Sequence, residues 1–245
     1  VRPRPPSAVL PAFASVPAAL MLLNAQLDGL VVLGIGAAIA LWSRPYFAGL
    51  ALGLTLMKPQ LVLPIGAALL VSRQWRVLAG WAAAGLALWA SAAVLNPRWV
   101  LDWLAPSGTT IQPGAREVDL PHLGTLLPAP WQLYAVAALT VLAVAGVALL
   151  ARRCRFGIQG QAAILIAGGV LAAPHALPAD LVVVGLGLAI WGRARWHDWL
   201  LLSVGAAIAA LAPAPWPAIV GVLLIGWLLV RLSGWRPGRE PAFAG

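Results

Sequence analysis

The apolar stretches of this chain constrain its fold more than any other feature, since they recur along the whole sequence between short clusters of arginine. Several are about 20 residues long, the length that a helix needs to cross the hydrocarbon core of a bilayer. The composition agrees: 62% of the residues are hydrophobic and only 9% are charged, whereas about a quarter are charged in soluble domains. We therefore predict an all-α, polytopic helical membrane protein.

The basic residues are concentrated between the apolar stretches. The net charge of +9 could suggest nucleic-acid binding, but short arginine clusters between apolar runs are typical of the loop charges that set membrane topology. We therefore expect no nucleic-acid partner. The single cysteine, Cys154, excludes an internal disulfide and a cysteine-based metal site. In the stretch "RRCRF" we interpret it as inert.

The apolar segments cover about residues 8–23, 27–42, 46–71, 75–95, 131–151, 158–172, 180–191, 199–211 and 216–232. They predict about eight spans, and several are short enough to indicate tilted or broken helices. Residues 1–245 are predicted to form a single transmembrane domain, with the Pro- and Gly-rich stretch 96–130 as an extracytoplasmic loop. The chain begins at Val1 and has no signal peptide. We expect that the N-terminal part of a longer protein is missing.

The arginines predict the orientation of the spans, since basic loops remain on the cytoplasmic side. The arginines assigned to that side are Arg2, Arg4, Arg44, Arg73, Arg76, Arg152, Arg153, Arg155, Arg193, Arg195, Arg231, Arg236 and Arg239. Arg98 and Arg116 belong to the loop assigned to the outside. The spans then alternate in direction, except for segment 46–71, which has arginines at both ends. If this segment crossed the membrane once, every later loop would change sides and its arginines would face outward.

That segment contains the only lysine of the chain, in "LTLMKPQLVLP". A hairpin of two half-helices removes the topological conflict, because both ends then stay inside. Each half has about 13 residues, or ~20 Å, which is less than the ~30 Å hydrocarbon thickness. Pro59 removes an amide donor and disfavours helix at Lys58, so we predict a re-entrant or broken helix pair here. The alternative is one long tilted helix with Lys58 snorkelling to the surface.

Other polar side chains occupy the turns that this topology places outside. They are Asn24, Gln26 and Asp28 in "LLNAQLDGL", His175 and Asp180 in "LAAPHALPADLVV", and Arg116, Glu117, Asp119 and His122 in the long loop. Ionisable residues within a membrane are costly and usually mark a functional site. We predict that Gln26, His175 and Asp180 lie with Lys58 around one outward-opening cavity. Individually, these residues could instead be helix caps or ordinary loop residues.

Three stretches in order resemble glycosyltransferase family 87: "NAQLDGLVVL", "RPYFAGLALGLTLMKPQLVLPIGAALLVSRQWRVLAG" and "APHALPADLVVV". The family shows a Gly-Gln-x-Asn-like turn, an Ala-Gly-Leu-x-x-Gly-Leu segment ending in Lys-Pro, an Arg-x-Trp-Arg end and a late Ser-Pro-His…Tyr-Asp-Leu turn. The resemblance covers about residues 10–190, and its middle motif is the most specific. The matching site positions are Gln26, Lys58, Pro59, His175 and Asp180.

The chain departs from the family pattern at four positions. Ala25 stands where the family favours Gly, Asp28 where it favours Asn, Ala173 where it favours Ser, and Ala179 where it favours Tyr. These departures affect the expected substrate contacts more than the expected fold.

The resemblance implies a GT-C type enzyme of the cell membrane. Such an enzyme moves a sugar, here expected to be mannose, from a polyprenyl-phosphate donor to a lipid-linked glycan acceptor, with inversion and on the extracytoplasmic side. Lys58 is assigned to the donor phosphate, since an ammonium is a compact charge for phosphate. Asn24, Gln26, Asp28, His175 and Asp180 are assigned to the substrate cavity. The catalytic base is expected upstream of Val1, so this chain alone could be inactive. We assign no cofactor and no metal ligand, although a divalent metal stays open.

Two other classes of protein fit the same features. A polytopic transporter or lipid flippase also has broken helices and polar groups at mid-membrane depth, but no inverted repeat is evident in the sequence. A non-catalytic membrane subunit is the third interpretation. Transfer or hydrolysis of a lipid-phosphate sugar by the purified protein would separate the enzyme from both.

Overall fold

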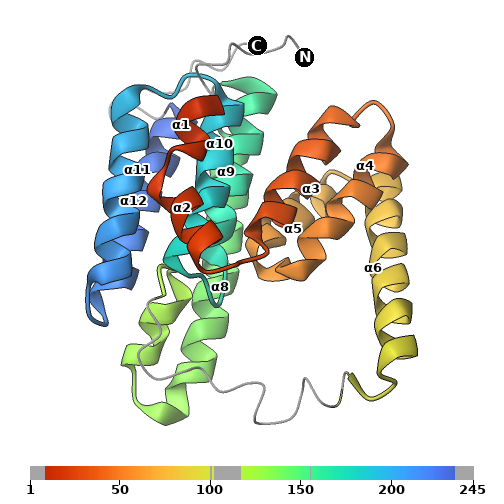
Figure 1. Cartoon of the computed structure of the whole chain (residues 1–245), viewed down its shortest axis with the longest axis horizontal. Coiled ribbons are helices and arrows are strands. Elements are labelled where there is room, and N and C mark those ends of the chain that lie inside the picture. The colour runs from red at the N-terminus through yellow and green to blue at the C-terminus, as the bar shows by residue number, and fades with distance from the viewer. Residues whose placement is uncertain (1–8, 100, 102–116, 155, 235–245) are drawn as a thin grey trace.

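The computed structural model describes residues 9–99, 101, 117–154 and 156–234, and these residues form helices without any strand. The all-α prediction is therefore confirmed for the described part of the chain. Residues 100 and 102–116 of the predicted loop 96–130 lie outside it, as do Arg2, Arg4, Arg155, Arg236 and Arg239. Figure 1 shows the course of the helices.

The α-helices are α1 (Val9–Phe13), α2 (Val16–Leu23), α3 (Asp28–Ala40), α4 (Pro45–Leu52), α5 (Leu63–Val71), α6 (Trp75–Leu95), α8 (Ala129–Arg152), α9 (Gly157–Ala172), α10 (Leu181–Trp191), α11 (Trp196–Leu211) and α12 (Trp216–Ser233). Short 3-10 helices are η2 (Gly53–Met57), η3 (Pro59–Val62), η5 (Pro121–Leu126) and η6 (Pro178–Asp180).

The predicted number of membrane spans is confirmed only in part. Among the described residues, three helices are long and apolar enough to cross a membrane, namely α6, α8 and α12. The other apolar helices have 10–17 residues, so the count of eight full spans is not confirmed. The predicted first segment is divided into α1 and α2, with Pro17 in the first turn of α2. The shortness of these helices follows from such interruptions.

The break at Lys58 is confirmed. Residues 45–57 run as α4 and then η2, Lys58 has an extended backbone (φ −143°, ψ 70°), and the chain resumes as η3 and α5. The start of α4 packs on the start of α6, because an added Cβ at Gly80 would lie 2.1 Å from the carbonyl oxygen of Tyr46. Since α6 directly follows α5, both ends of the segment lie close together. The two halves thus form a hairpin, and the alternative of one long helix is wrong.

Glycine allows the closest helix contacts around this hairpin. An added Cβ at Gly49 would lie 2.0 Å from the carbonyl oxygen of Val77, and one at Gly169 would lie 1.8 Å from that of Leu61. Backbones that approach so closely leave no room for a side chain, as is common between membrane helices. The first contact attaches α4 to α6, and the second attaches η3 to α9. The tip that carries Lys58 is therefore anchored against the centre of the bundle.

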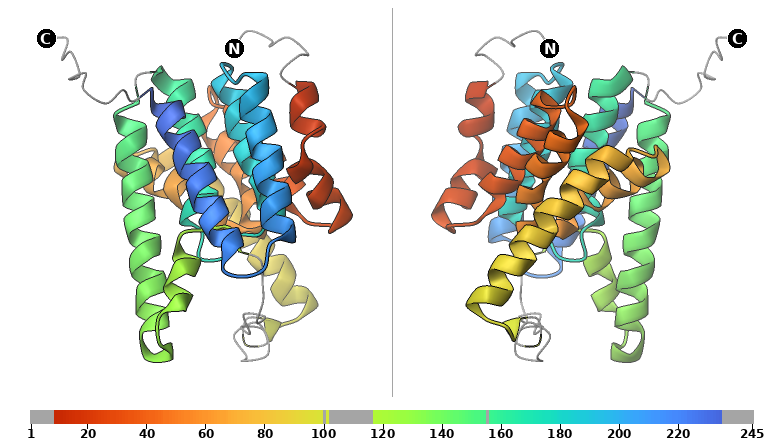
Figure 2. Two further views of the ribbon diagram at one scale, coloured as in Figure 1. Left: turned by 90° about the vertical axis from the view of Figure 1, so that its left-hand side faces the viewer. Right: turned by 90° about the vertical axis from the view of Figure 1, so that its right-hand side faces the viewer.

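Helix α9 lies at that centre. It contacts α8, α10, α12, α5 and η3, and its buried residues include Ile164, Ile166 and Val170. Helices α10, α11 and α12 complete the bundle on one side, and the α3–α6 unit lies on the other (Figures 1 and 2). Helix α8 and η5 extend beyond the rest of the bundle (Figure 2).

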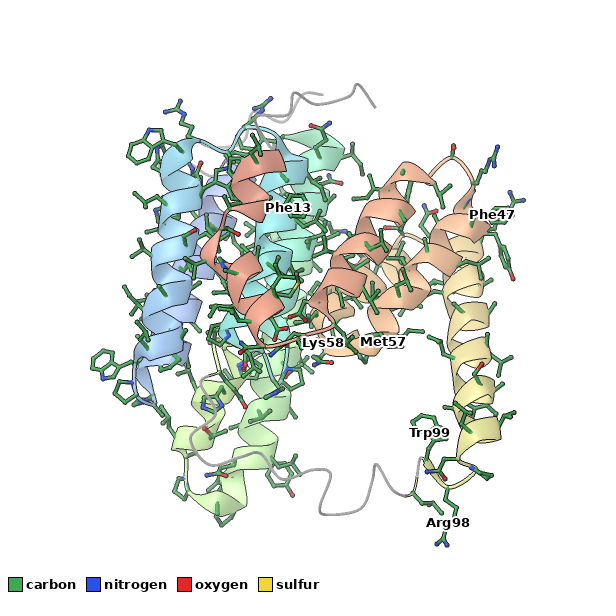
Figure 3. All side chains as sticks on the ribbon, viewed as in Figure 1. Phe13, Phe47, Met57, Lys58, Arg98 and Trp99 are labelled. Carbon is green, nitrogen blue, oxygen red and sulfur yellow. The ribbon has the colours of Figure 1, made fainter. Side chains whose placement is uncertain are left out.

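The turns that carry arginine lie at one end of the bundle. The turns after α3, α8 and α10 lie at the top of Figure 1. Residues at the C-terminal ends of α3, α5 and α8, namely Trp42, Ser72 and Arg152, line a common cavity. We call this the arginine end; its described arginines are Arg44, Arg73, Arg76, Arg152, Arg153, Arg193, Arg195 and Arg231. Figure 3 shows Lys58 and Met57 at the tip of the hairpin, far from Phe47 near its arginine end. The lysine therefore points away from the arginine clusters.

Candidate functional site

Lys58 is surrounded by three acceptors from different parts of the chain. Its Nζ lies 2.5 Å from Oε1 of Gln26 and 2.6 Å from Oδ1 of both Asp28 and Asp180. The lysine side chain is 19% exposed, whereas those of Asp28 and Asp180 are 0% and 2% exposed. We call these four residues the Lys58 cluster. The ammonium donates hydrogen bonds to Gln26 and Asp180 and forms an ion pair with Asp28.

Each member of the cluster is placed by a break in the helices. Gln26 belongs to the turn between α2 and α3, where Ala25 has a positive φ of 49°, and Asp28 is the first residue of α3. Lys58 is the extended residue between η2 and η3. Asp180 ends η6, and its Oδ2 accepts a hydrogen bond of 2.7 Å from the backbone amide of Leu177. This bond directs Oδ1 of Asp180 toward Lys58.

The charges in the Lys58 cluster are unequal. Two carboxylates face one ammonium, so the cluster carries a net negative charge when all three groups are ionised. A buried charge is costly unless it is paired and hydrogen-bonded, and Lys58 provides that partner for both acids. An anion that reached Lys58 would have to replace one of its present acceptors. The cluster therefore joins three helix ends through one shared cation.

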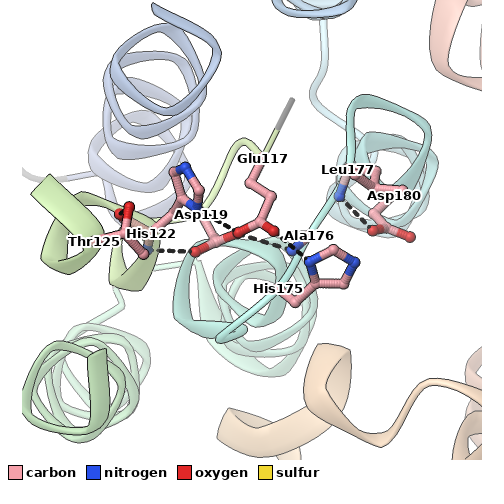
Figure 4. A network of polar contacts seen from close by, with 8 residues as sticks. All are labelled: Glu117, Asp119, His122, Thr125, His175, Ala176, Leu177 and Asp180. Carbon is pink, nitrogen blue, oxygen red and sulfur yellow. Dashed lines mark hydrogen bonds and ion pairs between the residues drawn. The ribbon is translucent and has the colours of Figure 1, made fainter. Parts of the chain in front are cut away.

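A second polar cluster surrounds Glu117 (Figure 4). Its Oε1 lies 2.6 Å from Nδ1 of His175, and its Oε2 lies 2.5 Å from Nδ1 of His122. Asp119 accepts hydrogen bonds of 2.8 Å from the backbone amides of His122 and Ala176. We call Glu117, Asp119, His122 and His175 the Glu117 cluster. It attaches the segment before η5 to the turn between α9 and η6.

The environment shifts the protonation of this cluster. Burial by itself would raise the pKa of Glu117, but hydrogen bonds from His122 and His175 outweigh it and hold that pKa at about 2, below the usual 4.5. The hydrogen bond to Glu117 raises the pKa of His122 and of His175 above 6.5, against the opposing effect of burial. Burial raises the pKa of Asp119 to about 7, although its backbone hydrogen bonds lower it. Glu117 is thus a stable carboxylate beside two readily protonated histidines.

The two clusters meet in the turn between α9 and α10. His175 and Asp180 both belong to this turn, and the charge of Asp180 contributes to the raised pKa of His175. The His175 side chain is 51% exposed, whereas those of His122 and Glu117 are 14% and 2% exposed. The turn therefore presents one accessible imidazole next to the Lys58 cluster.

The residues that the sequence predicts for the site lie in or beside these two clusters, except Asn24. The structure brings Gln26, Asp28 and Asp180 to Lys58, and it places His175 in the adjoining cluster. Asn24 is exposed at the end of α2, where its backbone amide bonds to Leu20. An outward-opening cavity around these residues stays a prediction, as do their roles with a substrate.

Glu117, Asp119 and His122 are polar residues of the predicted outer loop, and the sequence alone gave no reason to assign them to the site. They follow Arg116 in a loop whose neighbours gave no reason to select them. The only available signal was the occurrence of two acids and a histidine within six residues of an otherwise acid-poor chain. Their partner His175 lies 58 residues away from Glu117, so only the tertiary contact reveals the cluster.

A further buried ion pair lies near the arginine end. The Nε of Arg231 on α12 lies 2.6 Å from Oδ1 of Asp198 on α11, whose side chain is fully buried. The guanidinium also lies 5.8 Å and 5.7 Å from the ring centres of Trp191 and Trp227, and its Nη2 is 3.1 Å from Nε2 of His197. One cation here meets one carboxylate. The arrangement joins α10, α11 and α12.

The described residues contain no group of three or more His, Cys, Asp or Glu side chains placed to hold a metal ion.

Comparison with known proteins yields one match. The model of glycosyltransferase family 87 matches residues 2–178, well over half of the chain. This range contains every member of the two clusters except Asp180, which lies just beyond its end. No curated protein sequence and no solved structure matches the chain.

Proposed function

The chain belongs to glycosyltransferase family 87, and from this premise we propose that it is a hexosyltransferase using a polyprenyl-phosphate sugar. The sugar is mannose, and the acceptor is the hydroxyl of a lipid-linked glycan. Membership of the family implies a glycosyltransferase, and its apolar helices make it a membrane protein. The donor, the acceptor and the side of the membrane are the parts that we add.

One observation carries this proposal: the only lysine of the chain is held at the broken tip of a hairpin inside an apolar bundle. Backbone that departs from a helix at this depth is tolerated where it is buried in protein or faces a wet cavity. Glycine contacts anchor the tip against α6 and α9, and three acceptors hold the ammonium. A cation so well positioned in a low-dielectric surrounding is suited to stabilise charge that develops during a reaction.

The proposed reaction develops such a charge. The acceptor oxygen attacks the anomeric carbon from the side opposite the phosphate, and the bond between that carbon and the phosphate oxygen breaks. The configuration is therefore inverted, and the departing polyprenyl phosphate gains negative charge. In our proposal Lys58 exchanges one of its carboxylate partners for this phosphate. A carboxylate must also take the acceptor proton, and we assign that role to no residue of this chain.

The accessible His175 supports a site in the same place, since it adjoins the Lys58 cluster and carries a raised pKa. The proposed active site faces the extracytoplasmic side because Lys58 points away from the arginine end, and arginine-rich loops remain in the cytoplasm. This orientation suits a donor and an acceptor that are both attached to lipids.

The decisive experiment replaces Lys58 in the full-length enzyme. We expect Lys58→Met to reduce transfer from a polyprenyl-phosphate mannose by roughly 100-fold, the usual effect of losing one group that stabilises a transition-state charge. Lys58→Arg should restore only part of the activity, because a planar guanidinium fits a point-charge site poorly. Arg76→Met, at the exposed start of α6, is the matched control and should retain full transfer.

A structural role for Lys58 predicts a different pattern. If the ammonium served only to join helices, Lys58→Met would lower the membrane level and the thermal stability of the protein together with its activity. The double variant Lys58→Met with Asp28→Asn leaves one unpaired carboxylate instead of two, so it would then recover part of the lost membrane level, stability and activity. Normal transfer by the Lys58→Met variant, or recovered transfer by the double variant, would overturn the proposal.

A further inference from the structure

A cavity of 540 Å³ lies between α3, α5, α8 and α9, near the arginine end. Its volume is within the usual range of small-molecule sites, roughly 300–1,000 Å³. Its interior is apolar and includes many alanines, whose small side chains leave the space between the four helices unfilled. The polar side chains that line it are Ser72, Gln74, Arg152 and Gln161.

These polar residues share one position in the fold, the ends of helices at the mouth of the cavity. Ser72 follows α5, Gln74 precedes α6, Arg152 ends α8, and Gln161 lies near the start of α9. The deeper lining, such as Ile35 and Leu52, is apolar and buried. The cavity is therefore amphipathic, with a polar mouth and a hydrocarbon interior.

The mouth has a positive electrostatic character. Arg152 supplies a full charge, and helix α9 begins beside it without a side chain that caps its first amides. Free amides at helix N-termini favour anions. None of the lining residues is acidic. A negatively charged group is thus favoured at the mouth, while the interior favours an alkyl chain.

This cavity is distinct from the Lys58 cluster. Asp28 begins α3, and Trp42, which lines the cavity, follows the end of the same helix. The fourteen-residue separation corresponds to ~20 Å at 1.5 Å per residue. A lipid with its phosphate beside Lys58 would therefore have its headgroup at the opposite end of α3 from the mouth of this cavity.

We propose that the cavity binds an acidic glycerophospholipid, with one acyl chain in the apolar interior and the phosphate at the mouth beside Arg152. Water would not be stable in the interior, because apolar cavities of this kind stay dry. An acyl chain is the occupant that the surrounding bilayer supplies at high concentration, and burial of its methylenes in the apolar interior favours binding. The lipid comes from the leaflet at the arginine end, and it fills the space between the hairpin and the α8–α9 pair.

The test measures lipid retention by the purified full-length protein. The protein is exchanged into detergent with equal amounts of phosphatidylglycerol and phosphatidylcholine, and bound lipid is counted by native mass spectrometry. We expect one phosphatidylglycerol per chain, retained about tenfold more than phosphatidylcholine. Ala148→Phe, which fills the cavity from α8, should abolish retention of both lipids.

The arginine separates headgroup recognition from chain burial. Arg152→Gln should remove the preference for phosphatidylglycerol while phosphatidylcholine is still retained. Arg153→Gln is the matched control, because Arg153 is exposed, adjacent in sequence and absent from the lining; this variant should behave like the wild type. The exposed position of Arg152 makes its variant informative even if the phenylalanine variant does not fold.

Three results would overturn the proposal. They are equal retention of the two lipids by the wild type, equal loss of preference in the Arg152→Gln and Arg153→Gln variants, and retention that Ala148→Phe leaves unchanged in a folded protein. A dimer that Ala148→Phe dissociates would show that a second chain, and not a lipid, covers this cavity.

Discussion

Two buried ion clusters in this protein differ in their balance of charge. At the arginine end, Arg231 meets the single carboxylate of Asp198 and lies between two tryptophan rings. At the hairpin tip, Lys58 meets two carboxylates and a side-chain amide, and an exposed histidine lies in the same turn as Asp180. The first cluster has one acid for one base, whereas the second has an excess of acid.

The difference indicates different tasks. A balanced pair, in which one cation meets one carboxylate on a neighbouring helix, joins helices and leaves no second carboxylate for the cation. Lys58, in contrast, has two carboxylate partners. If it releases Asp28 or Asp180, the other carboxylate still pairs with it. The Arg231 pair therefore fits a structural role, and the Lys58 cluster fits a site whose cation changes partner. Three predictions can break or sharpen this comparison.

The largest difference is expected from matching substitutions of aspartate by asparagine. Asp198→Asn leaves Arg231 without a carboxylate, and breaking a buried pair in this way costs about 3–5 kcal/mol. Because the Arg231 side chain is 29% exposed, we expect the lower end, about 3 kcal/mol. Asp28→Asn should cost less than about 1 kcal/mol, since Asp180 and Gln26 remain on Lys58. Thermal unfolding of the purified variants measures both.

Equal losses of stability in these two variants would contradict the assigned roles. In that case both clusters would be structural, and the excess acid at Lys58 would have no separate meaning. Asp198→Asn is also expected to loosen α12 from α11, which limited proteolysis of the α11–α12 turn can detect.

An intermediate effect is expected from Glu117, which adjoins the site. Glu117 raises the pKa of His122 and His175. A histidine with a raised pKa in the folded state stabilises the protein below its usual pKa of 6.5, and this stabilisation is lost as the pH rises through the folded-state value. We therefore expect the melting temperature of the wild type to fall by a few degrees between pH 7 and about pH 9. Glu117→Gln should remove most of this fall.

Asp119, whose pKa is about 7, is half ionised at pH 7 and almost fully ionised at pH 8, so the part of the fall above pH 8 reports the histidines and not this acid. Thr125→Ala provides the control, since it removes a hydrogen bond to the carbonyl oxygen of His122 without removing a titrating group. It should lower stability by the same amount at every pH. A pH profile of Glu117→Gln that parallels the wild type would show that the histidines do not depend on this carboxylate.

The smallest effect concerns sidedness and should leave stability and activity unchanged. Ser72 and Asn96 flank the single helix α6, so they should lie on opposite sides of the membrane. In a Cys154→Ala background, an impermeant maleimide added to intact cells should label the Asn96→Cys variant and not the Ser72→Cys variant. Permeabilised cells should show labelling of both. The reverse pattern in intact cells would place the arginine end outside and the Lys58 cluster inside.

Local patterns predicted several features of the fold correctly. The hairpin at Lys58 followed from Pro59 and from arginines at both ends of the segment, because the backbone restriction by proline and the cost of reversing loop charges are local effects. The approach of Gln26, Asp28 and Asp180 to Lys58 agreed with their common side in the predicted topology. The predicted count of about eight spans is not confirmed, since length counts of apolar residues do not show where proline and glycine interrupt a helix.

The Glu117 cluster and the lipid cavity illustrate the opposite case. Glu117 and His175 lie on segments far apart in sequence, and their pairing depends on how the loop before η5 docks on the turn after α9. The cavity arises because alanines of four helices happen to face one another, a fact that no single helix reveals.

By itself, the sequence determined the class of the protein, its helical segments, the break at Lys58 and the separation of arginines from the polar turns. These properties depend on hydrophobic length, backbone restriction and loop charge, each of which acts within one segment. Only the tertiary structure decided which acids neutralise Lys58, that two of them share it, and that Arg231 has its own carboxylate. Pairing of buried charges depends on distances of a few ångströms between separate helices, and those distances are set by the packing of glycine-lined contacts throughout the bundle.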